Sequence, residues 1–151
     1  MNEVIKREFT HLKIHTQYSI CEGALRTLDL AKYCKTNKIK AVGLCDSNNL
    51  CGALEFSESI SKSKTQPIIG TQINIQYKGH SGKIPLFAKD LEGYKNLIKL
   101  SSKSFLEIKD NEEPHCKIED VESNCKGLIL LTGSRNYSSL AGVSIQIRID
   151  F

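Results

Sequence analysis

The spacing of hydrophobic and polar residues predicts strands and helices in alternation along this chain of 151 residues. Short apolar or alternating runs, several of them rich in β-branched residues, are typical of strands. Such runs predict strands over residues 9–15, 40–45, 67–77, 83–88 and 127–132. Residues 78–82 contain two glycines and are expected to form a turn.

Apolar residues spaced three and four apart predict helices between these strands. Thr27, Asn49 and Asp90 are expected to cap helices that run to about residues 36, 60 and 107, and residues 118–123 predict a short fourth helix. The expected inward-facing positions are Leu28, Ala31 and Cys34 in the first helix, Leu50, Ala53, Leu54, Ser57 and Ile60 in the second, and Tyr94, Leu97, Ile98 and Ser101 in the third.

This order of elements predicts an α/β fold with parallel β/α units and right-handed crossovers. In such folds the chemistry gathers at the carboxyl ends of the strands. His15, Asp46 and Gln72 each lie at or near a predicted strand end. We therefore expect these three side chains to belong to one site.

Composition adds few constraints. With 40% hydrophobic and 25% charged residues the chain is typical of one globular domain. The net charge of +4 permits nucleic-acid contact, but lysines spread over solvated faces give the same total. No run of about 18 apolar residues and no apolar signal-peptide core is present, which predicts a cytoplasmic protein without membrane contact.

The six cysteines form no C-x-x-C pair. In a reducing compartment such cysteines are expected to be free thiols, most of them buried as small apolar groups. A structural zinc site that uses Cys45 and Cys51 is a weaker alternative.

The segment before the first predicted helix carries candidate metal ligands. In an extended strand His11, Lys13 and His15 share a face, and Glu22 can return toward it from the following turn. Imidazole and carboxylate are the usual ligands of catalytic divalent metals, whereas a charged lysine has no lone pair to donate. The segment therefore indicates a metal-hydrolase site that has lost part of its metal chemistry.

Four stretches together resemble the polymerase and histidinol phosphatase (PHP) domain that begins the alpha subunit of bacterial DNA polymerase III. They are residues 9–23, 44–52, 64–72 and 90–102, and residues 128–134 also fit. The helix start Gly93-Tyr94-x-Asn96-Leu97 is the most specific of these signals for the polymerase branch. The resemblance implies an amidohydrolase-like, distorted (β/α)7 barrel, incomplete at its C-terminal end.

The resemblance also implies a place for three metal ions, which are zinc or manganese in the metal-binding relatives. His15 stands where the second histidine of the first motif belongs. Glu22 stands where the family usually has aspartate, and Asp46 matches the aspartate of the second motif.

Four further ligand positions are substituted. Lys13, Ser47 and Lys83 stand where the family has histidines, and Gln72 stands where it has a metal-bridging glutamate. A unit charge at about 4 Å from a cation costs on the order of 4 kcal/mol at an effective dielectric of 20. We therefore expect no tightly bound metal cluster, no cofactor and no catalytic residue in this chain. Instead, Lys13 or Lys83 is expected to pair with Glu22 or Asp46.

The resemblance implies a role in DNA replication as a non-catalytic scaffold and docking module. The implied partners are the rest of the alpha subunit and the proofreading exonuclease subunit, with DNA bound only through the full-length polymerase. Polymerase activity would require a later palm domain, which uses magnesium. One alternative is an active metal-dependent phosphoesterase or 3′–5′ exonuclease, and another is an α/β module of unrelated function.

We expect three segments along the chain. Residues 1–8 form a lead-in, residues 9–141 form a partial PHP domain, and residues 142–151 form a divergent tail. Within that tail, positions 143–151 alternate between apolar and polar residues and predict a strand with an exposed edge. This pattern suggests that the natural continuation is replaced, as in a fragment or a frameshifted product.

Overall fold

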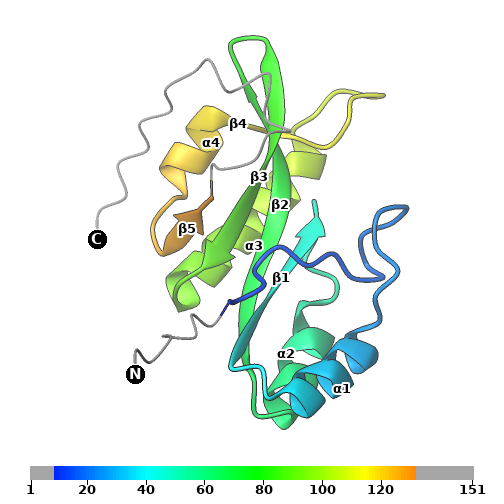
Figure 1. Ribbon diagram of the computed structural model, residues 1–151. Helices are drawn as coiled ribbons and strands as arrows, with labels where there is room; N and C mark the ends of the chain where they lie inside the picture. The colour runs from blue at the N-terminus through cyan, green and yellow to red at the C-terminus, as the bar shows by residue number, and fades with distance from the viewer. Residues whose placement is uncertain (1–8, 132–151) are drawn as a thin grey trace, which may run out of the picture.

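The computed structural model describes residues 9–131, in which five strands form one mixed sheet (Figure 1). The expectations for residues 1–8, 132–141 and 142–151 lie outside the described residues. The strand order is β1-β2-β3-β5, and the short β4 pairs with β2 off this path. The strands are β1 (Ala41–Ser47), β2 (Gln66–Tyr77), β3 (His80–Ala88), β4 (Cys116–Lys117) and β5 (Leu128–Leu130).

The predicted α/β fold is confirmed, but only part of the sheet is parallel. β1 runs parallel to β2 through a helical crossover, whereas β3 is antiparallel to both β2 and β5. The reason is the turn between β2 and β3. Lys78 and Gly79 both have positive φ, of 47° and 80°, as a two-residue hairpin turn requires, and a parallel connection needs many more residues.

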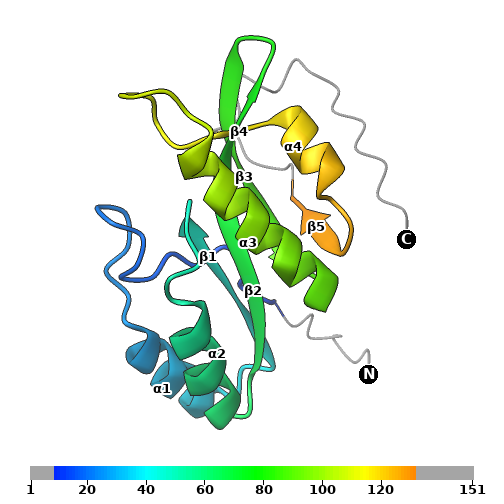
Figure 2. The same ribbon diagram turned by 180° about the vertical axis from the view of Figure 1, so that it is seen from behind.

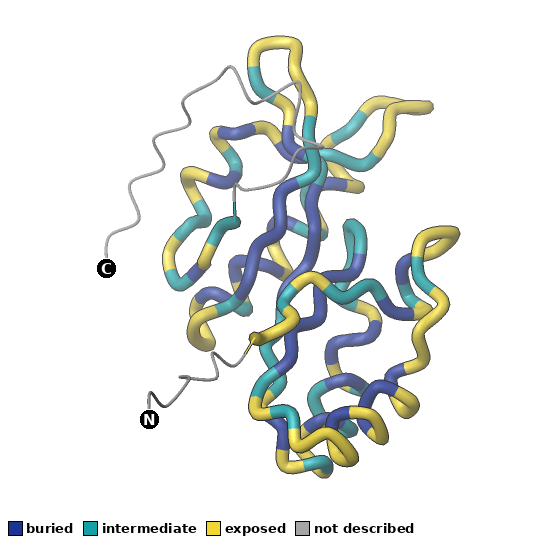
Figure 3. Tube along the Cα trace, viewed as in Figure 1, coloured by how far each residue is buried: buried dark blue, intermediate teal, exposed yellow. Residues whose placement is uncertain are grey.

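The four helices pack on one face of this sheet. They are α1 (Thr27–Asn37), α2 (Ala53–Lys62), α3 (Leu91–Leu106) and α4 (Ile118–Ser123). On β2, Ile69 contacts the apolar cluster of α1 and α2, and Ile73 and Ile75 belong to the cluster of α3 and α4. Odd-numbered residues of one strand share a face, so both clusters lie on the same side of the sheet. Figure 2 shows α3 in front of the strands, and Figure 3 shows that much of the central strands is buried. Even-numbered residues of β2 face the opposite side. This side also carries Ser47, which pairs with Gln72, and Lys83, which pairs with Asn74.

The cap of α3 is confirmed, since the Asp90 carboxylate accepts a hydrogen bond of 2.8 Å from Gly93 N. The other two predicted caps are wrong. Arg26 precedes α1 and Thr27 is its first residue, and Gly52 precedes α2 while Asn49 instead accepts a hydrogen bond from Cys51 N in a local turn. Asn and Thr favour such turns as readily as helix starts.

Three predicted inward-facing residues are also exposed. Leu28, Leu54 and Ile98 keep 60%, 73% and 44% of their surface in contact with solvent. Each helix offers more than one apolar stripe at helical spacing, and the packing selects another one. The buried residues are Thr27, Leu30, Ala31 and Cys34 in α1, Ala53, Phe56 and Ile60 in α2, and Gly93, Asn96, Leu97, Leu100 and Ser104 in α3.

The predicted strand over residues 9–15 is wrong as a regular element. The segment runs beside β1 with a single bridge, between Ile14 and Leu44. Its carbonyls at His11 and Ile14 accept from Gly43 N and Cys45 N, both at 2.8 Å. The accepting residues, His11 and Ile14, are three positions apart, whereas the donating residues of β1, Gly43 and Cys45, are two positions apart. The segment therefore contains one extra residue, as in a β-bulge. This extra residue breaks the alternation that would place His11, Lys13 and His15 on one face.

Candidate functional site

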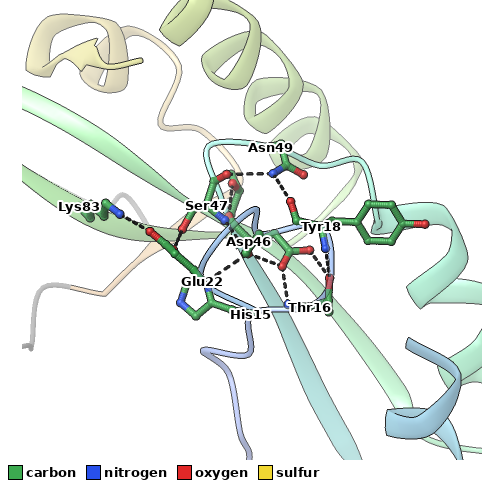
Figure 4. A network of polar contacts seen from close by, with 10 residues as sticks. His15, Thr16, Tyr18, Glu22, Asp46, Ser47, Asn49 and Lys83 are labelled. Carbon is green, nitrogen blue, oxygen red and sulfur yellow. Dashed lines mark hydrogen bonds and ion pairs between the residues drawn. The ribbon is translucent and has the colours of Figure 1, made fainter. Parts of the chain in front are cut away.

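The candidate site lies at the carboxyl end of β1, where the loop of residues 16–25 folds back over the strand (Figure 4). Gln17 N donates to Leu25 O at 3.0 Å and closes the base of this loop. The structure brings His15, Glu22, Asp46, Ser47 and Lys83 together here.

Asp46 is fully buried, and protein donors occupy its carboxylate. Thr16 N and Thr16 Oγ1 donate to its two oxygens at 2.6 and 2.7 Å, and Ser19 Oγ donates to Oδ1 at 2.6 Å. Hydrogen bonds to a charged acceptor are the stronger kind, which stabilises this arrangement. Asp46 therefore fastens the loop of residues 16–25 to the end of β1.

Glu22 has a different environment. Lys83 Nζ donates to its Oε1 at 2.6 Å, and Ser47 Oγ donates to its Oε2. These hydrogen bonds, that of Lys83 first, lower the pKa of Glu22 below its ordinary value. The side chains of Lys83 and Glu22 remain 42% and 37% exposed, so water screens the pair. The expected replacement of a metal by a lysine–carboxylate pair is present here between Lys83 and Glu22.

His15 lies between the two carboxylates. Its Nδ1 is 3.3 Å from Ser19 Oγ and 3.8 Å from Glu22 Oε2. Burial lowers the pKa of His15, Glu22 raises it, and the positive charge of Lys13 lowers it further. The balance keeps the imidazole neutral to a lower pH than in an exposed histidine.

Lys13 and Gln72 do not join this network. Lys13 is exposed, and within residues 9–131 no hydrogen bond or ion pair joins it to Glu22 or Asp46. Gln72 pairs in register with Ser47 and is 4% exposed, and its Oε1 finds no hydrogen-bond donor among the described residues. Of the two lysines, Lys83 forms the expected pair, and within residues 9–131 Lys13 does not.

Sequence reasoning missed the hydroxyl and amide residues that build the site. Thr16 and Ser19 satisfy Asp46, and Asn49 Nδ2 donates to Tyr18 O and Ser47 O at 3.0 and 2.9 Å. Tyr18 OH also donates to Glu55 of α2 at 2.5 Å. A signal was available, since Thr16 and Ser19 are spaced for a turn directly after His15.

The cysteines lie outside this network. All six are free thiols as predicted, but only Cys34, Cys45 and Cys116 are buried. Burial raises the pKa of Cys45 to about 12, so its thiol stays protonated at neutral pH. Cys51 is exposed.

The donors of the site do not fit a cluster of three divalent cations. Asp46 is enclosed by three protein donors, and Glu22 is held by an ammonium group and a hydroxyl. In residues 9–131, no group of three or more His, Cys, Asp or Glu side chains gathers in an arrangement that could hold a metal ion. An ion at Glu22 would have to displace Lys83, whose positive charge opposes it.

Comparison with known proteins identifies the family. Residues 11–145 match the family described as the PHP domain. The chain belongs to the PHP domain family. This PHP domain is 40% identical over 128 residues to DNA polymerase III subunit alpha of Rickettsia bellii, a match that covers 84% of this chain and 11% of the relative. It is 35% identical over 142 residues to the same subunit of Thermus aquaticus, covering 85% of this chain and 12% of the relative.

The PHP domain thus spans about a tenth of the length of these relatives. A solved structure described as a putative metal-dependent phosphoesterase from Bifidobacterium adolescentis shares the fold, with a TM-score of 0.52. The two are 17% identical, and the match covers 63% of this chain and 32% of the other. Among the described residues, no helix has the length and apolar character needed to cross a bilayer.

Proposed function

We propose that this PHP domain serves DNA replication as a non-catalytic scaffold and docking module, in the N-terminal region of a DNA polymerase III alpha subunit. The identity of about 40% to such subunits over most of the chain supports the assignment to this branch of the family. The partners under this proposal are the rest of the alpha subunit and the proofreading exonuclease subunit. DNA would be reached only through the full polymerase.

The observation that carries the non-catalytic role is the hydrogen bonding of the two carboxylates. The Asp46 carboxylate accepts hydrogen bonds from Thr16 and Ser19 and so holds a loop in place. The Glu22 carboxylate accepts a hydrogen bond from Lys83. Both arrangements stabilise the domain without a metal ion. A docking module needs a stable surface, and these contacts supply it.

Under this proposal the chain binds no divalent metal tightly and has no activity of its own. Metal-dependent phosphoester hydrolysis requires a bound ion that activates water and stabilises charge. The side chains present supply two lysines, a serine and a glutamine where such ions would need donors with negative charge or imidazole nitrogen.

Metal content after loading tests the proposal. The purified chain is incubated with Mn²⁺ or Zn²⁺, passed through a desalting column, and analysed by elemental mass spectrometry. We expect well below one ion per chain. A matched variant with Lys13→His, Ser47→His, Gln72→Glu and Lys83→His should retain more metal. Stoichiometric metal in the unmodified chain, together with hydrolysis of a phosphodiester, would favour the active phosphoesterase instead.

A second experiment tests docking. The chain is mixed with the purified proofreading exonuclease subunit and analysed by size-exclusion chromatography with light scattering. Co-elution in a defined ratio is expected. The Asp46→Asn variant should reduce the amount of complex only as far as it reduces the amount of folded chain. Separate elution at concentrations well above the micromolar range would contradict the docking role.

A further inference from the structure

Helix α3 carries a second apolar stripe on the side opposite its buried face. Leu91, Ile98 and Phe105 are seven residues apart and 68%, 44% and 51% exposed. Residues at this spacing lie nearly above one another along a helix, as in the seam of a coiled coil. We call these three residues the α3 outer stripe.

The α3 outer stripe faces away from the sheet. In Figure 2, α3 lies in front of the strands, and no other described element covers its outer side. The residues that α3 buries against the sheet and α4, among them Leu97 and Leu100, lie on the opposite side of the helix. Three large apolar side chains at a regular spacing on an otherwise solvated face are typical of a binding surface.

The charges beside the stripe are positive. Lys95 follows Leu91 by four residues, Lys99 extends the same flank by one turn, and both lysines are exposed. Within residues 9–131, neither lysine forms an ion pair. The acidic residues near the helix ends are already engaged, since Glu92 lies 3.1 Å from Lys126 and Glu107 lies 3.4 Å from Lys103.

We propose that the α3 outer stripe docks an acidic amphipathic helix of another protein chain. An apolar seam with a period of seven fits the apolar face of a partner helix, and Lys95 and Lys99 select glutamate or aspartate beside that face. The stripe is short and flanked by serines and lysines, which is typical of a reversible contact rather than a permanently buried one.

A second copy of this chain is a poorer occupant. Pairing of two α3 helices would bring Lys95 and Lys99 of one copy close to the same lysines of the other. Like charges across an interface oppose association. The inference rests on the proposed docking function and assigns its surface. The metal-loading experiment tests residues on the face of the sheet without helices, whereas the peptide experiment below tests α3. The absence of bound metal and the docking at α3 can therefore each fail while the other holds.

The test uses two synthetic helical peptides of about 20 residues, long enough to form helix in water. One has a leucine seam flanked by glutamates, and the other has the same seam flanked by lysines. Each is titrated into the ¹⁵N-labelled chain and followed by two-dimensional NMR. We expect saturable shifts confined to α3 with the glutamate peptide, and binding weaker by about tenfold or more with the lysine peptide.

Variants make the result specific. Ile98→Asp and Phe105→Asp should each weaken the glutamate peptide by about tenfold or more. Leu54→Asp, at a leucine of α2 that is 73% exposed, should leave binding unchanged. Lys95→Glu with Lys99→Glu should reverse the preference between the two peptides. The NMR spectrum of each variant reports whether it is folded.

Four results would overturn the proposal. The first three are no binding of the glutamate peptide to the folded chain, equal binding of both peptides, and shifts that map away from α3. The fourth is concentration-dependent dimerisation that is lost in Ile98→Asp, which would assign the stripe to a second copy.

Discussion

The two carboxylates of the candidate site lie near the same end of β1 but depend on different physical contacts. Asp46 is fully buried and accepts hydrogen bonds from Thr16 and Ser19. Glu22 remains partly in water and pairs with Lys83. A buried carboxylate without partners would be very costly, whereas an exposed one is solvated in any case. We therefore expect the first to determine stability and the second to contribute little.

Strand alternation explains how adjacent residues reach such different environments. Asp46 and Ser47 are consecutive in β1 and belong to opposite faces of the sheet. Thr71, opposite Asp46, donates its hydroxyl to the Asp46 carbonyl at 2.7 Å, while Gln72 pairs in register with Ser47. The residues at substituted ligand positions, Ser47, Gln72 and Lys83, thus gather on the face without helices.

The largest effect is expected at Asp46. The Asp46→Asn change replaces one accepting oxygen by an NH2 group, which faces the same donors of Thr16 and Ser19. We expect the free energy of unfolding to fall by about 3 kcal/mol or more, because buried donors lose a charged acceptor. Urea unfolding followed by circular dichroism measures it. The same chemical change in Glu22→Gln should cost about 1 kcal/mol or less, and equal losses would remove the distinction between the two sites.

A smaller effect is expected at Lys83. The Lys83→Met change breaks the 2.6 Å contact with Glu22 but leaves that carboxylate in water. We expect a loss of about 0.5 to 1 kcal/mol, the usual size for a partly exposed pair. Lys13→Met is the matched control, since Lys13 is exposed and joined to neither carboxylate, and it should change stability by less than about 0.5 kcal/mol. A larger loss of stability for Lys13→Met than for Lys83→Met would mean that Lys13, and not Lys83, forms the stabilising pair.

Much of the fold was predictable because its signals are local. The Asp90 cap, the β-branched run of β2 and the glycine turn before β3 each depend on a few neighbouring residues. The stripes of α1 and α2 were less predictable. Leu28 and Leu54 fit a helical period as well as the residues that are buried, and only packing against other elements selects between them.

The candidate site was predictable only in part. The sequence order placed His15, Asp46 and Gln72 near strand ends. The structure brings His15 and Asp46 together through Ser19, whereas Gln72 stays outside the network. The sequence could not reveal the extra residue between His11 and Ile14, because a bulge depends on pairing with another strand. Nor could it show that Thr16 and Ser19 would satisfy Asp46, since these contacts span 30 and 27 positions.

Acid unfolding provides a further test of the exposed carboxylate. The pKa of Glu22 in the folded chain lies below the ordinary value of 4.5, through Lys83 first and then Ser47. The stability from this pair is therefore present above about pH 5 and is lost as the pH falls through the folded pKa. The free energy of unfolding is measured in urea at about pH 6 and about pH 3.5. Its decrease between the two pH values should be smaller for Glu22→Gln than for the unmodified chain. An unchanged decrease would mean that Glu22 does not contribute to acid sensitivity.

The smallest effect is expected in the titration of His15, which reports the charges of Glu22 and Lys13 that act on it. Burial first, and then the charge of Lys13, lower the pKa of His15 below its ordinary value, whereas the charge of Glu22 raises it. Glu22→Gln removes a charge that raises this pKa and should lower it further, whereas Lys13→Met removes a charge that lowers it and should raise it. NMR titration of the imidazole protons of His15 measures both shifts. If neither variant moves the His15 titration, Glu22 and Lys13 do not act electrostatically on His15, and the site is held together by the hydrogen bonds of Asp46.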